Sequence, residues 1–491
     1  MKLINKTLIS SFILCGGSIG TNAALTSNNS KKIDKAPNIV ILFVDDLGWT
    51  DLGYQNPQLH TPHINQLKSE GLYLSRAYVS TATSSPSRAS LLTGKEAVRT
   101  GFVRHIPDNP DRKEYHYLAS DPAQMPSRNW LKLNETTYAE RLHELGYKSL
   151  FLGKWHLGHE GYFPINQGFD EMYGTCEHGH PNSYYAPFFN THNPLPNAKP
   201  GVDYITDMLT DKAVNYIDTY KGNKPFLLNM SYYTVHGPHV GRKDFLKQYQ
   251  QEGIKVRAKN QPNITDPVYR KRLDNMDSSY PDFAAMVSAL DESVGRIREA
   301  LIKKGFDKNT MIIFTSDQGG TFTNAPLNGG KMGGFTDYEG GSRVPMIIYY
   351  PGMQAMGTED QTPVETLDLY PTMVELASGK PCKEKQLNGE SLLPLLEGET
   401  LAPRDLFLYR SYENQNDAII SGDWRLIKYR DGNCELFNIR QDEGQEHNLI
   451  ARYPERAASL KTRLLEWERE AIPGELLLDE HAKGFTTGKK K

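Results

Sequence analysis

Five short apolar runs constrain the fold of this 491-residue chain more than any other feature. Residues 39–44 read Ile-Val-Ile-Leu-Phe-Val, with no polar interruption. Such a run is typical of a strand buried on both faces, as in a parallel sheet. Similar runs recur at residues 149–152, 225–230, 311–315 and 346–350.

Helical patterns lie between these runs. Thr137 and Glu140 form a capping box that opens a helix, which Gly146 can close. Apolar residues spaced three and four apart over residues 283–301 predict one long helix ending at Gly305. The alternation of strands and helices predicts an α/β fold: a large, doubly wound, mixed and mostly parallel sheet flanked by helices.

The pattern changes after about residue 400. Short apolar segments at residues 406–409, 418–420, 424–428 and 435–437 are separated by turn residues, and a helical pattern covers about 455–470. This predicts a smaller C-terminal α+β subdomain with an antiparallel sheet. We therefore expect an α/β catalytic domain over residues 37–400, the subdomain over 401–480 and a Lys-rich tail over 481–491.

The first 24 residues are typical of a secretory signal peptide. Lys2 and Lys6 precede an apolar stretch at residues 8–15, and Thr21-Asn22-Ala23 fits a cleavage site. Residues 25–36 are polar and are expected to form a flexible lead-in. The chain is thus expected to be exported to the periplasm without a transmembrane segment; secretion and lipid anchoring at Cys15 stay open.

Composition argues against nucleic-acid partners but does not decide whether the chain contains a disulfide bond. The 56 basic and 59 acidic side chains give a formal net charge of -3, which argues against the broad basic face that non-specific nucleic-acid binding needs. Three cysteines, Cys176, Cys382 and Cys434, follow the signal peptide. A bridge between Cys382 and Cys434 cannot be decided from the sequence.

Polar clusters follow four of the five apolar runs. They are Asp45-Asp46, Lys154 with His156, His236 with His239, and Asp317-Gln318. Ligands of open α/β sheets bind beyond the carboxyl ends of the strands. The four clusters are therefore expected to converge on one site.

The chemistry of these side chains indicates a cation and an oxyanion. Asp45, Asp46, Asp317 and Gln318 supply only oxygen ligands, which suit one divalent hard cation, Ca²⁺ before Mg²⁺, rather than zinc. A cation beside Lys154, His156, His236 and Lys331 could hold a tetrahedral oxyanion. Sulfuryl and phosphoryl transfer are both open at this point.

Residues 84–94 resemble a known family signature. They match the sulfatase pattern C/S-x-P-S-R-x-x-x-L-T-G at every fixed position, with Ser84 first and Arg88 fifth. Other segments resemble the same family in the same order: V-D-D-L-G-W from Val44, G-K-W-H-L-G from Gly153, H-G-P-H from His236 and S-D-Q-G-G from Ser316, followed by Lys331. The chain thus resembles the formylglycine-dependent sulfatases of the alkaline-phosphatase-like superfamily, bacterial carbohydrate sulfatases in particular.

This resemblance implies a mechanism. Residue 84 would be oxidised during export to formylglycine, by a formylglycine-generating enzyme or a radical maturase, and its hydrate would be both a metal ligand and the nucleophile that forms a covalent sulfo-enzyme. Arg88 would hold that nucleophile, and Lys154 and Lys331 would clamp the sulfate oxygens. His236 would protonate the leaving oxygen, and His156 would deprotonate the second hydroxyl of the hydrate.

Two positions depart from the common pattern of the family. Gln318 stands where Asn is commonest, which weakens that single ligand assignment. Ser84 stands where Cys is commonest. The chain is then either a native serine-type enzyme or an inactive Cys→Ser variant.

The substrate is expected to be a sulfated sugar of a glycosaminoglycan- or mucin-type glycan, with aryl sulfates as the simpler alternative. Residues 174–189 form a loop rich in Tyr, Phe and His that is suited to binding a sugar. Four histidines, His105, His178, His180 and His239, are the candidate substrate ligands. Two other classes stay open: a phosphomonoesterase or phosphodiesterase that uses Ser84 directly, and a catalytically dead protein that binds sulfated glycans.

Overall fold

The computed structural model describes residues 36–108, 112–118, 125–257, 271, 277–331, 337–411 and 417–476. The expected signal peptide, the lead-in up to Lys35 and the tail lie outside these ranges, so those assignments stay predictions. The expected domain boundary near residue 400 also stays a prediction. The chain from Ala36 onward forms one compact unit.

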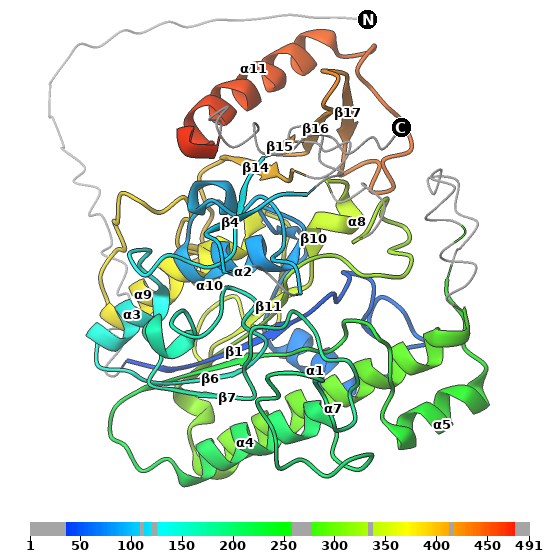
Figure 1. Ribbon diagram of the computed structural model, residues 1–491. Coiled ribbons are helices and arrows are strands. Elements are labelled where there is room, and N and C mark those ends of the chain that lie inside the picture. Colours follow the sequence, from blue (N-terminus) through cyan, green and yellow to red (C-terminus); the bar gives the residue numbers. More distant parts are fainter. Residues whose placement is uncertain are drawn as a thin grey trace, which may run out of the picture. The chain divides into compact units, whose positions relative to one another are not determined.

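A large mixed sheet lies at the centre of this unit (Figure 1). Among the described residues it has eight strands in the order β12-β2-β11-β9-β1-β8-β6-β7. The bounds are β1 Asn38–Val44, β2 Leu72–Leu74, β6 Lys148–Gly153, β7 Glu171–Tyr173, β8 Phe226–Ser231, β9 Thr310–Ser316, β11 Met346–Tyr349 and β12 Glu359–Asp360.

The five predicted buried strands are β1, β6, β8, β9 and β11. β1 lies between β8 and β9 and runs parallel to both, with Ile41 opposite Asn229 and Ile313. β6 runs parallel to β8 and β7, but β11 pairs antiparallel with β9 and β2. The mixed, mostly parallel sheet is therefore confirmed. The fifth apolar run forms β11, which is an antiparallel strand of this sheet.

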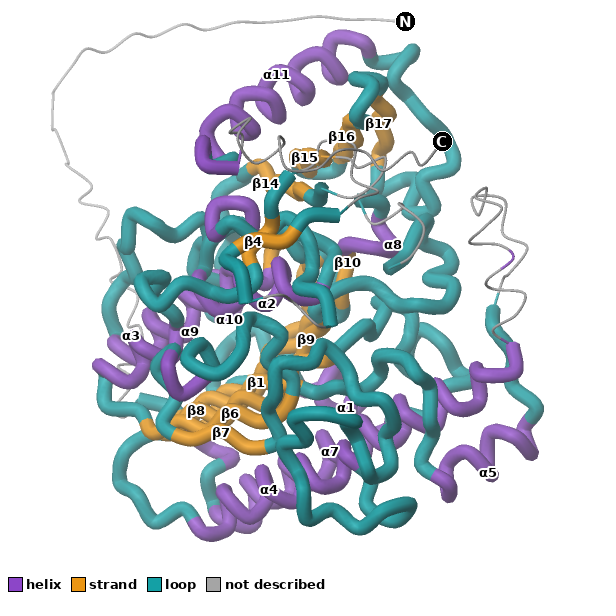
Figure 2. The backbone as a smooth tube through the Cα atoms, viewed as in Figure 1, coloured by secondary structure: helices purple, strands orange, loops and turns teal. Residues whose placement is uncertain are grey.

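Helices cover both faces of the sheet (Figure 2). α1, α4, α5 and α7 lie on one face, and α2, α3, α9 and α10 lie on the other. Their bounds are α1 Pro62–Glu70, α2 Ser84–Thr93, α3 Tyr138–Glu144, α4 Ile205–Thr219, α5 Lys243–Glu252, α7 Tyr280–Lys304, α9 Leu369–Ser378 and α10 Leu393–Leu396. Burial on both faces explains why residues 39–44 are apolar throughout.

Two predicted helix boundaries are confirmed by their caps. Thr137 Oγ1 accepts a hydrogen bond from the Glu140 backbone N–H at 3.2 Å, and the Glu140 carboxylate accepts one from the Thr137 N–H at 2.8 Å. α7 ends at Gly305, whose φ of +70° is the left-handed conformation that glycine adopts without strain. α3 ends one residue earlier than expected, because Leu145 caps it and Gly146 follows.

The C-terminal part forms the predicted antiparallel sheet. The order is β14-β15-β16-β17, with bounds β14 Asp405–Tyr409, β15 Asp417–Ser421, β16 Trp424–Lys428 and β17 Cys434–Asn438. α11 (Pro454–Ala471) packs on it through Leu460, Leu464 and Trp467. Arg425 on β16 is fully buried and forms an ion pair with Glu339, which joins this sheet to the larger part.

Short elements complete the described fold. They are β3 Ala77–Tyr78, β4 Tyr115–His116, β5 Ser127–Arg128, β10 Arg343–Val344, β13 Val364–Glu365 and α8 Glu339–Ser342. Within the described ranges, the helices are too short or too polar to cross a bilayer. Cys176, Cys382 and Cys434 are all free thiols, so the bridge left open above is not formed.

Candidate active site

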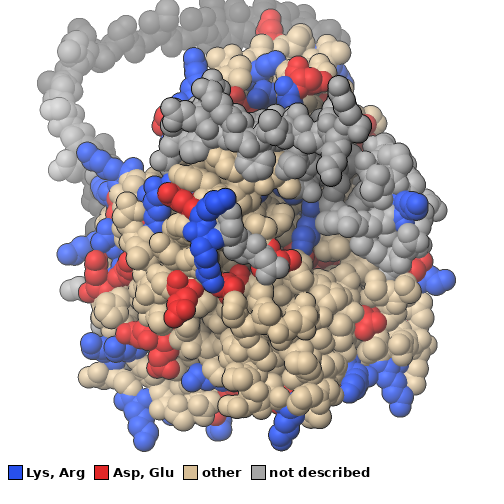
Figure 3. All heavy atoms as spheres, viewed as in Figure 1, with Lys and Arg blue, Asp and Glu red and all other residues tan. Residues whose placement is uncertain are grey.

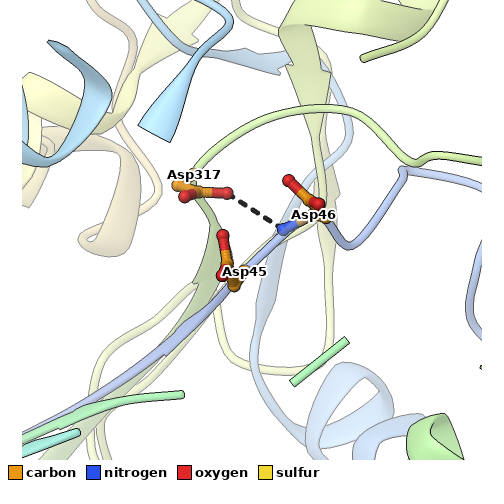
Figure 4. Close-up of side chains that lie close together, drawn as sticks. All are labelled: Asp45, Asp46 and Asp317. Carbon is orange, nitrogen blue, oxygen red and sulfur yellow. Dashed lines mark hydrogen bonds between the residues drawn. The ribbon is translucent and has the colours of Figure 1, made fainter. Parts of the chain in front are cut away.

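Three carboxylates meet at the ends of two neighbouring strands (Figure 4). Asp45 and Asp46 follow β1, and Asp317 follows β9. Ligand oxygens of the three side chains lie within 4.8 Å of one another, and all three residues are fully buried. Three buried acids at this spacing repel one another, so they require cationic partners, a bound cation or both.

Backbone geometry holds these acids in place. The Asp46 N–H donates to Asp317 Oδ1 at 3.0 Å, the bond drawn in Figure 4. Asp46 has a φ of +61°, and His156 a φ of +55°, a conformation unusual for residues other than glycine. Strained backbone of this kind clusters at functional sites, where the surrounding structure enforces it.

Gln318 completes an all-oxygen donor set. Its Nε2 donates to Asp46 Oδ1 at 2.5 Å and to Ser84 Oγ at 3.4 Å. Its Oε1 is buried and has no hydrogen-bond partner among the described residues. A buried amide oxygen without a donor is rare and is a suitable ligand for a hard cation. The residues therefore fit the predicted Ca²⁺ or Mg²⁺ site, with a glutamine in place of an asparagine.

Three basic side chains neutralise the carboxylates. Lys154 Nζ lies 2.7 and 2.9 Å from the two oxygens of Asp45, Arg88 Nη2 lies 3.0 Å from Asp317 Oδ2, and Lys331 forms an ion pair with Asp46. Burial raises the pKa of Asp45, although Lys154 opposes this shift. Burial also tends to raise the pKa of Asp46, but Lys331 and His236 outweigh it and hold that pKa well below its ordinary value.

Ser84 is the first residue of α2, a helix whose ten residues are all buried. Its Oγ lies 3.2 Å from Lys154 Nζ and 3.4 Å from Asp45 Oδ1. The N-terminus of a helix carries partial positive charge and free N–H groups, which favour an anion. The side chain of residue 84 therefore faces both the carboxylate cluster and the positive end of α2.

Two histidines have one ring nitrogen fixed by a carbonyl. His156 Nε2 lies 2.8 Å from the Ile106 carbonyl, and His236 Nδ1 lies 2.6 Å from the Gly237 carbonyl. Because a carbonyl can only accept, each of these nitrogens carries the proton in the neutral ring. The other nitrogens, His156 Nδ1 and His236 Nε2, remain able to accept a proton. Burial, followed by the positive charges of Lys154 and Lys331 respectively, lowers the pKa of both imidazoles well below the ordinary value.

A cavity of about 280 Å³ opens over these groups. It is lined by Thr83, Ser84, His105, Asp108, His156, Gly179, His180, His236, Gln318, Lys331 and Arg410. The structure thus brings Ser84, His156, His236, Lys331 and Gln318 to one cavity. His156, His236 and Gln318 come from the strand-end clusters that were expected to converge, whereas Ser84 and Lys331 lie outside those clusters. Arg88, Lys154 and the three aspartates lie buried beneath them.

Two of the four candidate sugar ligands line this cavity and two do not. His105 and His180 line it, and the His180 ring stacks on His236 at 4.9 Å between centroids. His178 instead bonds to Thr191 at 3.1 Å and stacks on Phe189, within its own loop. His239 packs against Phe283 and Phe322. His178 and His239 are therefore not among the lining residues, and their assignment as sugar ligands stays a prediction.

Sequence reasoning missed two charged residues of the cavity wall. Asp108 lies 3.4 Å from His180 Nε2 and raises the pKa of that histidine. Arg410 follows β14, so the C-terminal subdomain contributes to the cavity. Neither residue lies in a recognisable motif; only their proximity in the fold identifies them.

Comparison with known proteins decides the family. The sequence profile of the family described as Sulfatase matches residues 37–380. This chain belongs to the sulfatase family. Sulfatases are sulfuric ester hydrolases, and a second profile, for the C-terminal region of N-sulphoglucosamine sulphohydrolase, matches residues 335–470.

Relatives of this sulfatase are found in animals and bacteria. N-acetylgalactosamine-6-sulfatase of Mus musculus is 30% identical over 415 residues, which cover 79% of this chain and 71% of that protein. A sulfatase of Formosa agariphila is 27% identical and covers 90% of each chain. The crystal structure of Ps i-CgsB in complex with k-i-k-neocarrahexaose has a TM-score of 0.71 at 27% identity, covering 88% of this chain and 93% of that one.

Proposed function

We propose that this sulfatase removes O-sulfate from sugars of sulfated glycans, with residue 84 acting as a formylglycine. One observation carries the proposal: residue 84 lines a cavity of about 280 Å³, and its Oγ lies 3.4 Å from Asp45 Oδ1 and 3.2 Å from Lys154 Nζ. The comparisons support a sugar substrate, because one relative is named N-acetylgalactosamine-6-sulfatase and the similar structure is a complex with k-i-k-neocarrahexaose.

Some of the proposed groups activate the nucleophile, and others bind the sulfate or stabilise its charge. A cation held by Asp45, Asp46, Asp317, residue 84 and Gln318 would supply Lewis acidity, and the aldehyde hydrate at residue 84 would supply the nucleophilic oxygen. Lys331, on the cavity wall, would bind a sulfate oxygen. Lys154 lies 3.2 Å from Ser84 Oγ and would stabilise negative charge on that oxygen.

Arg88 positions residue 84 rather than the sugar. Its guanidinium is almost fully buried and donates to Ser231 Oγ at 2.6 Å, to the Lys154 carbonyl at 3.2 Å and to Asp317 at 3.0 Å. A planar fork held by three acceptors cannot easily rotate. It therefore fixes the ends of β6, β8 and β9 around the N-terminus of α2.

The two histidines are placed for proton transfer. His236 lines the cavity, and its Nε2 lies 3.6 Å from Asp46 Oδ2. Because Nδ1 carries the proton of the neutral ring, Nε2 must first take up a proton, which the Asp46 carboxylate favours, and we assign it the transfer of that proton to the leaving sugar oxygen. His156 Nδ1 is buried and has no hydrogen-bond partner in the described part of the chain, and we assign it the removal of a proton from residue 84 after the sugar has left. His105 and His180 would contact the sugar hydroxyls.

The proposal includes export and maturation. The features of residues 1–24 support transport to the periplasm, and a maturase that accepts serine would convert residue 84. We therefore expect activity only when the protein is made with such a maturase.

Mass spectrometry of the tryptic peptide spanning residues 77–88 tests the proposal. In protein from the native host we expect this peptide to be lighter than the unmodified one by two hydrogen atoms. N-acetylgalactosamine 6-sulfate is the first substrate to try, followed by other sulfated monosaccharides and an aryl sulfate. Active protein with unmodified Ser84 would contradict the formylglycine assignment, and turnover of aryl sulfates alone would contradict the sugar assignment.

A further inference from the structure

A second hollow of about 610 Å³ lies on the C-terminal subdomain. It is formed by the β15–β16 turn and the start of α11, and shares no lining residue with the active-site cavity. We call it the α11 groove. The residues that matter are Ser421, Trp424, Arg452, Tyr453, Arg456 and Arg463.

The α11 groove is basic, although the chain is acidic overall. Three guanidinium groups line it against one carboxylate, Glu455, whereas the whole chain has a formal net charge of -3. Arg463 already forms an ion pair with Asp405 and a hydrogen bond to Ser421. Arg452 and Arg456 are exposed, and their side chains form no ion pair or hydrogen bond within the described part of the chain.

Both arginines lie over aromatic rings. The Arg456 guanidinium lies 4.4 Å from the centre of the Trp424 ring, and that of Arg452 lies 5.4 Å from the centre of the Tyr453 ring. The two rings pack edge to face at 5.0 Å. A guanidinium that stacks on a ring uses its flat face, so the N–H groups at its edge stay free. These N–H groups can bind two oxygens of one oxyanion.

The backbone at the start of α11 also favours binding of an anion. Tyr453 is the N-cap of α11 and provides no side-chain hydrogen bond to the first turn of the helix. Pro454, the first helical residue, has no N–H, so the N–H groups outside the helical bonding pattern are those of Glu455 and Arg456; together with the helix dipole they favour negative charge. A pair of arginines at such a helix end suits an anionic ester better than a neutral sugar.

We propose that the α11 groove is a second, non-catalytic site that binds sulfate groups of a polymeric sulfated glycan. The identity of the ligand rests on the proposed function. Asp405, the partner of Arg463, begins β14, and Arg410 of the active-site cavity follows its end. Five strand residues span about 17 Å, so the groove would hold a polymer near the active site and raise its local concentration.

The test compares two double variants of the full-length, matured enzyme. Arg452→Ala/Arg456→Ala removes the proposed ligands, and Arg469→Ala/Lys303→Ala removes two exposed charges elsewhere. Binding to dextran sulfate, dextran phosphate and unmodified dextran is measured by affinity electrophoresis. We expect the groove variant to bind dextran sulfate at least tenfold more weakly than wild type, with the control unchanged and turnover of a sulfated monosaccharide unaffected.

Each contrary outcome has a distinct meaning. Wild-type affinity in the groove variant, or an equal loss in the control variant, would overturn the site. Binding of dextran phosphate as tight as that of dextran sulfate would overturn its assignment to sulfated glycans. If wild type desulfates no sugar but its binding still depends on Arg452 and Arg456, the proposed function fails and the binding site stands.

Discussion

Replacing Lys154 with methionine would test how the buried charges of the active site are balanced. Its Nζ lies within 2.9 Å of both oxygens of Asp45, and neither side chain is exposed. Methionine keeps most of the volume but removes the charge, which leaves Asp45 beside two other carboxylates. Breaking a buried ion pair in this way costs about 3–5 kcal/mol, so we expect the free energy of unfolding without added cation to fall by that amount.

Calcium should reverse part of this loss. The Lys154 ammonium and a cation would share the Asp45 oxygens and repel each other, so the variant should gain more from calcium than wild type does. Calcium at 100 times its Kd stabilises a protein by about 2.7 kcal/mol, and we expect the gain of the variant to exceed that of wild type by at least about 1 kcal/mol.

Urea unfolding with calcium or a chelator measures both effects, and sulfate release measures activity. We expect activity to fall roughly 10²–10³-fold, because the charge beside residue 84 is lost. Lys95→Met is the matched control: its pair with Glu135 is partly exposed, so a loss of at most about 1 kcal/mol and no calcium dependence are expected. A Lys154→Met variant that loses less than the control, or that gains no more from calcium than wild type, would refute the reasoning.

Three further changes test other parts of the structure. Burial raises the pKa of Asp51 from 3.8 to about 7, so the folded state keeps a proton that the unfolded state releases; stability should therefore fall between these pH values. Relative to wild type, Asp51→Asn should gain roughly 4 kcal/mol between pH 4 and pH 8 in urea unfolding, and a constant difference would contradict this. Gly319→Ala would place a Cβ 1.9 Å from the Gly340 carbonyl oxygen, and we expect a loss of roughly 3 kcal/mol or more; Gly474→Ala, whose Cβ has open space, is the control. Thr137→Ala should lower the unfolding free energy by about 1 kcal/mol through loss of the α3 cap, whereas no change would show that the capping box contributes nothing.

The sequence was most informative where local chemistry determines structure. Residues 39–44 predicted β1 because an unbroken apolar run must be buried, and Thr137 and Glu140 predicted the start of α3 because their reciprocal bonds are local. The polar strand ends were predictable for a similar reason: parallel strands end at one edge of the sheet. The direction of β11 was not predictable, because an apolar run has no feature that specifies parallel or antiparallel pairing.

Which side chains reach the cavity could not be predicted without the fold. His239 belongs to a strand-end cluster and His180 to the loop at residues 174–189, but His180 stacks on His236 at the cavity, whereas His239 packs against Phe283 and Phe322. Arg410 reaches the cavity only because the C-terminal sheet packs against the larger part of the chain. Such contacts join residues that are far apart in sequence, and no local pattern encodes them.

The balance of charge in the active site explains why a cation is needed. Three carboxylates, those of Asp45, Asp46 and Asp317, face three basic side chains, those of Lys154, Lys331 and Arg88. Without a cation these charges cancel, and the site has no net attraction for an anionic ester. A divalent cation would add two positive charges among the carboxylates and leave Lys331 freer to contact a sulfate oxygen. The cation would therefore determine whether the site attracts sulfate, in addition to activating residue 84.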